Sequence, residues 1–155
     1  MRKWLVLTAV LLTVALLVGC KTGTSSTGLG EGRGAITPDD FSPFGRGRAP
    51  LDLLPFTAPR DGRYRVTLAS GGGRDGLRNP VIWIMRGRVP ADQNGFLRAY
   101  DRGRGVIAQG DGQNIADVGF PATAGDMFTI VFTSAGNDVG NYNYEISGGG
   151  RPPRN

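Results

Sequence analysis

Two neighbouring stretches near the carboxyl end decide the fold: MFTIVFTS at residues 127–134 and NYNYEIS at residues 141–147. In both stretches a large apolar or aromatic residue recurs at every second position, which places these side chains on one face of an extended chain. Turn residues lie between the stretches, at Gly136-Asn137-Asp138. The pattern predicts two strands, each with one buried face.

The same period of two extends toward the amino end. Tyr64, Val66 and Leu68 alternate with polar residues, and residues 81–85 are apolar on both faces, as in a central strand. Further strand patterns occur at residues 53–57, 96–100, 105–109 and 115–120. Gly, Asn and Asp turns separate the segments, and no stretch after residue 20 has the pattern of a helix. We therefore predict an all-β domain, an antiparallel jelly-roll-like β-sandwich of seven or eight strands.

The composition limits the chemistry of the chain. Its 155 residues suffice for one domain, and 26 Gly with 10 Pro disfavour long helices. The chain has no His and one Cys, which excludes an intrachain disulfide, acid–base catalysis by His and Cys/His zinc sites. The serines have no His to activate them, and the only Lys beyond Lys3 is Lys21. We expect that the protein is not an enzyme.

The first twenty residues have the three parts of an export signal. Arg2 and Lys3 precede an uncharged apolar run at residues 4–18, which is shorter than the ~20 residues that span a bilayer. The run ends in Leu17-Val18-Gly19-Cys20, which resembles the lipobox of bacterial lipoproteins. The resemblance implies cleavage before Cys20 and attachment of a diacylglycerol and further acyl chains, such as palmitate, to that residue. Two or three acyl chains hold a protein firmly on a membrane.

These features predict four segments. They are a lipoprotein signal peptide at 1–19, the lipidated Cys20 with a flexible Gly/Ser/Thr tether at 20–35, the sandwich at 36–147 and a disordered tail at 148–155. The expected location is the cell envelope, with the lipid membrane bound through Cys20. Lys21, in place of an Asp after the cysteine, indicates the outer membrane if the bacterium has one.

The second half of the chain resembles the bacterial pre-peptidase C-terminal domain. The likeness covers roughly residues 50–147 and rests on three motifs: NPVIWI at 79–84, VIAQGDG at 106–112, and a closing hairpin formed by 120–134 and 140–146. It implies a small jelly-roll sandwich that serves as an accessory or binding domain without catalytic activity. Asn79 stands where that family has Asp, and Asp111-Gly112 replaces a paired Asp turn, so the acidic loops that bind calcium in some members are reduced here.

Two groups of polar residues are candidate binding sites. Oxygen ligands for calcium are present at Asp101, Asp111, Asn114 and Asp117, although such residues also stabilise turns through their own side chains. Guanidinium groups that suit a polyanion are present at Arg63, Arg65, Arg98 and Arg102, although they also suit a solvated face.

The expected function is a non-catalytic binding or scaffolding module for an envelope protein complex. The alternative is a module that binds a carbohydrate, or a ligand linked through calcium. Apart from the lipid on Cys20 and this possible calcium, we expect no cofactor. Nucleic acid is not an expected partner, because no platform of basic and aromatic residues is evident.

Overall fold

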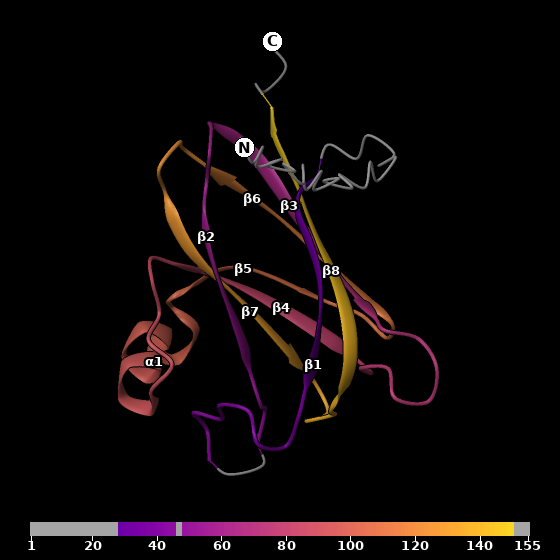
Figure 1. The fold of residues 1–155 in the computed structure, drawn as a ribbon. Coiled ribbons are helices and arrows are strands. Elements are labelled where there is room, and N and C mark those ends of the chain that lie inside the picture. The colour runs from indigo at the N-terminus through magenta and orange to yellow at the C-terminus, as the bar shows by residue number, and fades with distance from the viewer. Residues whose placement is uncertain (1–27, 46–47, 151–155) are drawn as a thin grey trace, which may run out of the picture.

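The computed structural model describes residues 28–45 and 48–150 and shows two antiparallel sheets packed face to face (Figure 1). Sheet A has the strand order β1-β8-β3-β6, and sheet B has the order β2-β7-β4-β5. The prediction of an all-β antiparallel sandwich is confirmed, and β4 is an inner strand as predicted. The strands are β1 (Gly28–Ile36), β2 (Asp52–Thr57), β3 (Gly62–Ser70), β4 (Pro80–Arg86), β5 (Val106–Asp111), β6 (Ile115–Ala122), β7 (Met127–Ser134) and β8 (Gly140–Gly150).

The main core lies between the sheets and follows the predicted period of two. Tyr64, Val66 and Leu68 of β3 are buried in one cluster with apolar side chains of sheet B, such as Ile84 and Phe132. The two arginines that alternate with them, Arg63 and Arg65, are exposed. Burial of apolar surface, at about 25 cal/mol per Å², is the main force that holds the two sheets together.

The strand β1 corrects the predicted domain boundaries. The composition predicts a tether at residues 28–35, but these residues pair with β8 in a regular antiparallel register from Gly30 to Ile36. The prediction is wrong here because the inward positions of β1 before Ile36 carry Gly, so this part of the strand shows no apolar alternation. β8 likewise extends to Gly150, into the predicted tail. The signal peptide, Cys20 and residues 151–155 lie outside the described residues.

Tyrosine rings from β8 fill the space beneath β1. A Cβ atom at Gly32 would lie 2.6 Å from the ring of Tyr144, and one at Gly34 would lie 2.5 Å from Cζ of Tyr142. The Tyr142 hydroxyl donates a hydrogen bond to the carboxylate of Asp52 on β2, so this side chain also joins the two sheets. The glycines of β1 are therefore part of the packing.

A second layer covers the outer face of sheet B. It consists of residues 37–45 and 48–51, between β1 and β2, and of the helix α1 (Gln93–Tyr100), which lies beside sheet B in Figure 1. The prediction of a strand at 96–100 and of no helix after residue 20 is therefore wrong. The carboxylate of Asp92 caps α1 by accepting a hydrogen bond from the backbone of Gly95, and Phe96 is fully buried. None of the helices in the described part of the chain is long and apolar enough to cross a membrane.

Two threonines of β7 bond to the connections on this side of the sheet, one to the connection between β4 and α1 and one to the segment between β1 and β2. The Thr129 hydroxyl donates to the carbonyl of Gly87 and accepts from the backbone N–H of Val89, both at 2.9 Å. The Thr133 hydroxyl donates to the carbonyl of Pro50 at 3.0 Å. Both threonines are buried, so β7 has two buried faces where the alternation predicted one.

Candidate functional site

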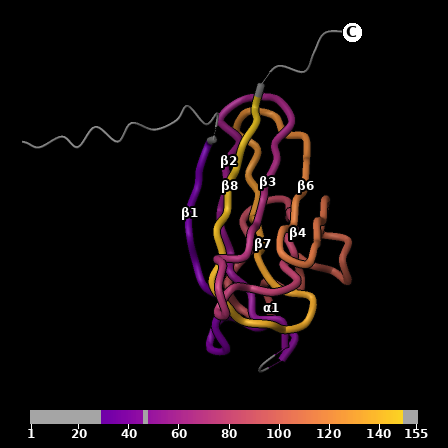
Figure 2. Tube along the Cα trace, turned by 90° about the vertical axis from the view of Figure 1, so that its right-hand side faces the viewer, coloured from indigo at the N-terminus to yellow at the C-terminus, as the bar shows by residue number. Residues whose placement is uncertain are grey.

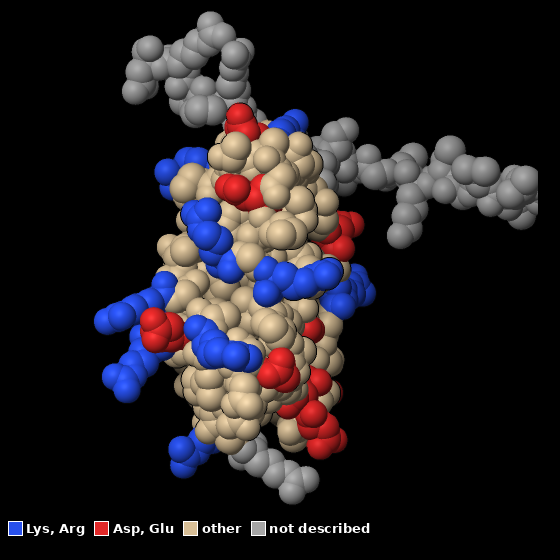
Figure 3. All heavy atoms as spheres, turned by 90° about the vertical axis from the view of Figure 1, so that its left-hand side faces the viewer, with Lys and Arg blue, Asp and Glu red and all other residues tan. Residues whose placement is uncertain are grey.

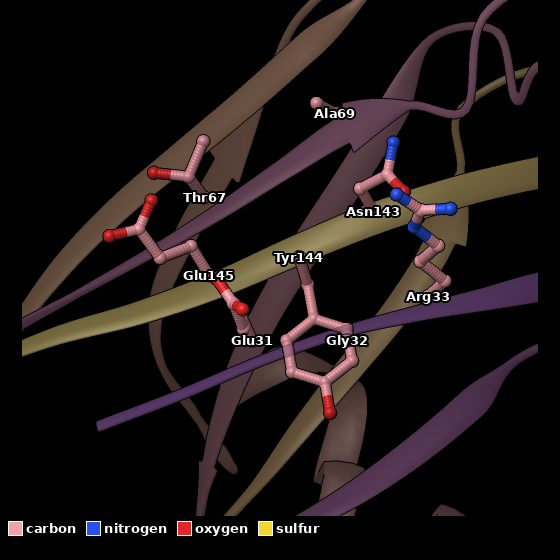
Figure 4. A pocket seen from close by; sticks show the side chains of 8 residues that line it. All are labelled: Glu31, Gly32, Arg33, Thr67, Ala69, Asn143, Tyr144 and Glu145. Atoms are coloured by element: carbon pink, nitrogen blue, oxygen red, sulfur yellow. The ribbon is translucent and has the colours of Figure 1, made fainter. Parts of the chain in front are cut away.

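The outer face of sheet A carries a shallow groove of about 620 Å³ (Figure 4). Its lining comes from three neighbouring strands, with small residues on β3 and longer polar side chains on β8 and β1. Figure 4 shows two chemically different ends: Glu145 and Glu31 lie at one, with Thr67 near Glu145, and Arg33 lies beside Asn143 at the other. The groove therefore offers carboxylates and a guanidinium to one ligand.

The acidic end is built from residues that the strand register places in one row. Glu31 of β1 is directly opposite Glu145 of β8, which is directly opposite Thr67 of β3. Like charges directly opposite one another on neighbouring strands are destabilising. Neither glutamate takes part in an ion pair with another described residue.

The row of Glu31, Glu145 and Thr67 continues on β6 with Asp117, which forms an ion pair with Arg65. Asp117 lies opposite Thr67 and accepts two hydrogen bonds from Arg65 Nε at 2.7 and 2.9 Å, and another from its NH2 group. The hydrogen bonds from Arg65 hold the pKa of the Asp117 carboxyl below its usual range. The same bonds raise the pKa of the Arg65 guanidinium. Asp117 is therefore engaged with Arg65 in this structure.

A smaller aromatic cleft lies on the outer face of sheet B. Its volume is about 220 Å³, and its walls include Trp83 of β4, Tyr100 of α1 and Gln109 of β5. The two aromatic rings are 5.5 Å apart and tilted by 40°. Within the described residues, neither the indole N–H nor the Tyr100 hydroxyl has a hydrogen-bond partner. The cleft thus combines apolar ring surface with donors that a bound ligand can reach, a combination common in small-molecule sites.

The predicted calcium ligands are not gathered into one site. Asp101 caps the end of α1 and pairs with Arg104 at 3.9 Å, Asp111 ends β5 in sheet B, and Asp117 belongs to sheet A. Asn114 lies in the turn before β6, where its carbonyl accepts from the backbone of Ser70. Among the described residues, no group of three or more acidic or Cys side chains is placed to hold a metal ion.

The predicted arginine set is divided between two surfaces. Arg63 and Arg65 share the outer face of β3, as predicted. Arg98 lies on α1, where its Nε donates to the carbonyl of Asn94 at 3.2 Å, and Arg102 follows in a short 3₁₀ turn. Figure 3 shows basic side chains spread singly over one face of the molecule, with acidic side chains among them. This face has no continuous basic patch.

Sequence reasoning missed the residues of the groove and recognised Trp83 only as part of the apolar central strand at residues 81–85. Glu31 and Arg33 lie in the predicted tether, so their alignment with β8 was hidden. Tyr100 lies in a predicted strand, so the wall that it forms with Trp83 was hidden as well. The one signal in the sequence was Asp92, a preferred helix-capping residue four positions before the apolar Phe96.

No family model matches the chain, and no curated protein matches it. Solved structures with a similar backbone include the pre-peptidase C-terminal domain of collagenase from Bacillus anthracis. It is 13% identical, with a TM-score of 0.48, over 76% of this chain and 88% of that chain. Another is the Yersinia pseudotuberculosis-derived mitogen, which is 12% identical, with a TM-score of 0.44, over 76% of this chain and 83% of that chain.

Proposed function

We propose that this protein is a lipid-anchored, non-catalytic binding module of the bacterial cell envelope. The observation that carries the proposal is the lipobox at Cys20, followed after residues 21–27 by the first strand of a folded sandwich. A chain of that length spans at most about 28 Å when fully extended. The sandwich is therefore held close to the bilayer, where it presents the groove and the aromatic cleft to other envelope components. Lys21 favours the outer membrane.

The side chains support binding in preference to catalysis. The sequence has no His, and the Ser134 hydroxyl accepts from the backbone N–H of Asp138 at 2.9 Å, which is the arrangement of a turn-stabilising serine. Glu31 and Glu145 are the best candidate pair for glycoside hydrolysis, which needs carboxylates on both sides of the scissile bond. They instead lie side by side on one face of sheet A.

Metabolic labelling with an alkyne fatty acid tests the anchor. We expect label on the wild-type protein and on a Thr22→Ala control, and no label on Cys20→Ser. The Cys20→Ser protein should also leave the membrane fraction in a carbonate wash. A Cys20→Ser protein that is still labelled, or that still sediments with membranes after the wash, refutes the anchor.

Crosslinking in intact cells identifies what the module binds. With a carboxyl-terminal tag, one protein captured in constant proportion is the result expected of an assembly subunit. Capture of glycan without such a protein favours the second candidate, a carbohydrate-binding module.

The carbohydrate alternative rests on the aromatic cleft. Trp83 is the only Trp that is left once residues 1–19 are removed, so its fluorescence reports on this cleft alone. Titration with soluble peptidoglycan fragments should give a saturable change in Trp83 fluorescence. Tyr100→Ala should abolish this change, whereas the control Ile115→Ala, at an exposed position on sheet A, should retain it. No change with these fragments refutes binding of this glycan in the cleft. The calcium-linked variant of this alternative predicts a melting temperature several degrees higher in excess calcium than in EDTA.

A further inference from the structure

The free edge of β1 is unusually open. Among the described strands, β1 pairs only with β8, and Figure 2 shows it along the outside of the molecule. Natural proteins normally protect edge strands with Pro, Lys, inward-pointing charges or a covering segment. β1 contains no Pro and no Lys, and its inward positions are Gly30, Gly32, Gly34 and the buried Ile36. Within residues 28–45 and 48–150, no strand pairs with the outer row of backbone donors and acceptors of β1, which we take as open to another strand.

The outward side chains of β1 carry one charge of each sign. Glu31 and Arg33 are both exposed, and neither forms an ion pair with another described residue. Glu31 also lies opposite Glu145, an unfavourable arrangement that a neighbouring cation would relieve. Glu31 and Arg33 lie one residue on either side of Gly32. A second copy of β1 running antiparallel therefore presents an opposite charge to each of them.

We propose that β1 pairs in antiparallel fashion with β1 of a second copy of this chain, in the register centred on Gly32. In this register Glu31 of each copy lies opposite Arg33 of the other. Leu29, within the irregularity of β1 between Gly28 and Gly30, lies across from Ala35. A shift by two residues in either direction keeps the same side chains on the same face of the sheet. Such a shift places Glu31 of one copy opposite Glu31 of the other, or Arg33 opposite Arg33. The charges therefore select one register. The two-fold contact closes on itself and joins the two A sheets into one continuous sheet.

The anchors are compatible with this dimer. Antiparallel pairing of β1 separates the two Gly28 residues by about 27 Å, at ~3.4 Å per residue. Residues 21–27 let each Cys20 lie up to about 28 Å from its Gly28. Both lipids can enter one bilayer when the two-fold axis is normal to the membrane. Confinement of both copies to one membrane raises their effective concentration, so a short strand pairing is sufficient.

Crosslinking of cysteines tests the register. In the full-length protein in intact cells, Leu29→Cys together with Ala35→Cys should give a dimer with a short bis-maleimide. Each single substitution should not, because like positions lie about 20 Å apart across the pair. The wild-type protein, treated with the same crosslinker, shows how much dimer arises through Cys20 alone. Absence of a dimer with both cysteines, or equal dimer from either single substitution, overturns the proposal.

Charge reversal then tests the contact that selects the register. Added to the cysteine pair, Glu31→Arg or Arg33→Glu alone should lower the dimer yield on the order of tenfold, since each places two like-charged pairs across the contact. The two reversals together should restore the yield, because opposite charges then face each other again across the contact. Because the combined variant carries both changes, recovery shows that neither reversal prevents folding. Failure to recover overturns the proposal.

Discussion

A single methyl group on the inner face of β1 should destabilise the whole sandwich. In Gly34→Ala, the new Cβ would lie 2.5 Å from Cζ of Tyr142 and closer still to its hydroxyl. The ring cannot simply turn away, because it is 2% exposed and bonded to Asp52. Overpacking costs about 1–3 kcal/mol. The hydrogen bond to a charged partner is worth about 1.5–3 kcal/mol when intact, and its partial loss adds a fraction of that. The lower entropy of the unfolded Ala chain offsets about 0.4–1 kcal/mol.

The net loss should be about 2–4 kcal/mol of unfolding free energy. For a domain of this size, this corresponds to a melting temperature about 8–16 °C lower. The matched control is Gly30→Ala on the same strand, where no atom lies within 4 Å of the added Cβ. That variant should melt at the wild-type temperature or slightly above it. Calorimetry of the chain without residues 1–19 measures both variants. Melting temperatures for the two variants within about 2 °C of each other would refute the packing role given to the glycines.

Three further outcomes are expected. Phe96→Ala should lower the unfolding free energy by about 3–5 kcal/mol, whereas its exposed neighbour Leu97→Ala should change it by less than about 0.5 kcal/mol, as denaturant titration will show. Burial raises the pKa of the Tyr142 phenol, so stability should fall above about pH 10, where the unfolded tyrosine ionises and the folded one does not. A flat stability profile between about pH 10 and 11.5 contradicts this. Arg65→Ala should leave the melting temperature within about 2 °C, since the pair is exposed, but NMR titration should show the pKa of Asp117 moving up toward its usual value.

The sequence predicted those elements whose buried face is made of their own apolar side chains. Val66 in β3 and Phe132 in β7 are examples, because each shows directly in the alternation which side faces the core. β1 was not predicted because most of its buried face is not made of its own side chains. The apolar surface beneath it comes from Tyr142 and Tyr144 on β8, and no local pattern at residues 28–36 can report a contribution from a strand more than a hundred residues away.

The candidate sites were hidden by the same limitation. The charged groove depends on the register between β1 and β8, so Glu31 and Glu145 could not be paired from sequence. The aromatic cleft depends on α1, which is eight residues long and contains Gly95, a residue that weakens any helical signal. Long-range pairing and a short capped helix are the two features for which local periodicity carries least information.

The strand order also has a consequence for the time at which the domain is completed. β8 lies between β1 and β3 in sheet A, although it is the last strand of the chain that the structure describes. Until β8 leaves the ribosome or an export channel, β1 has no partner and the space beneath its glycines is empty. Pairing of strands so distant in sequence requires closure of a long loop before any contact is gained, which slows folding. The domain therefore stays incompletely folded until β8 arrives, a state compatible with the export that we propose for this protein.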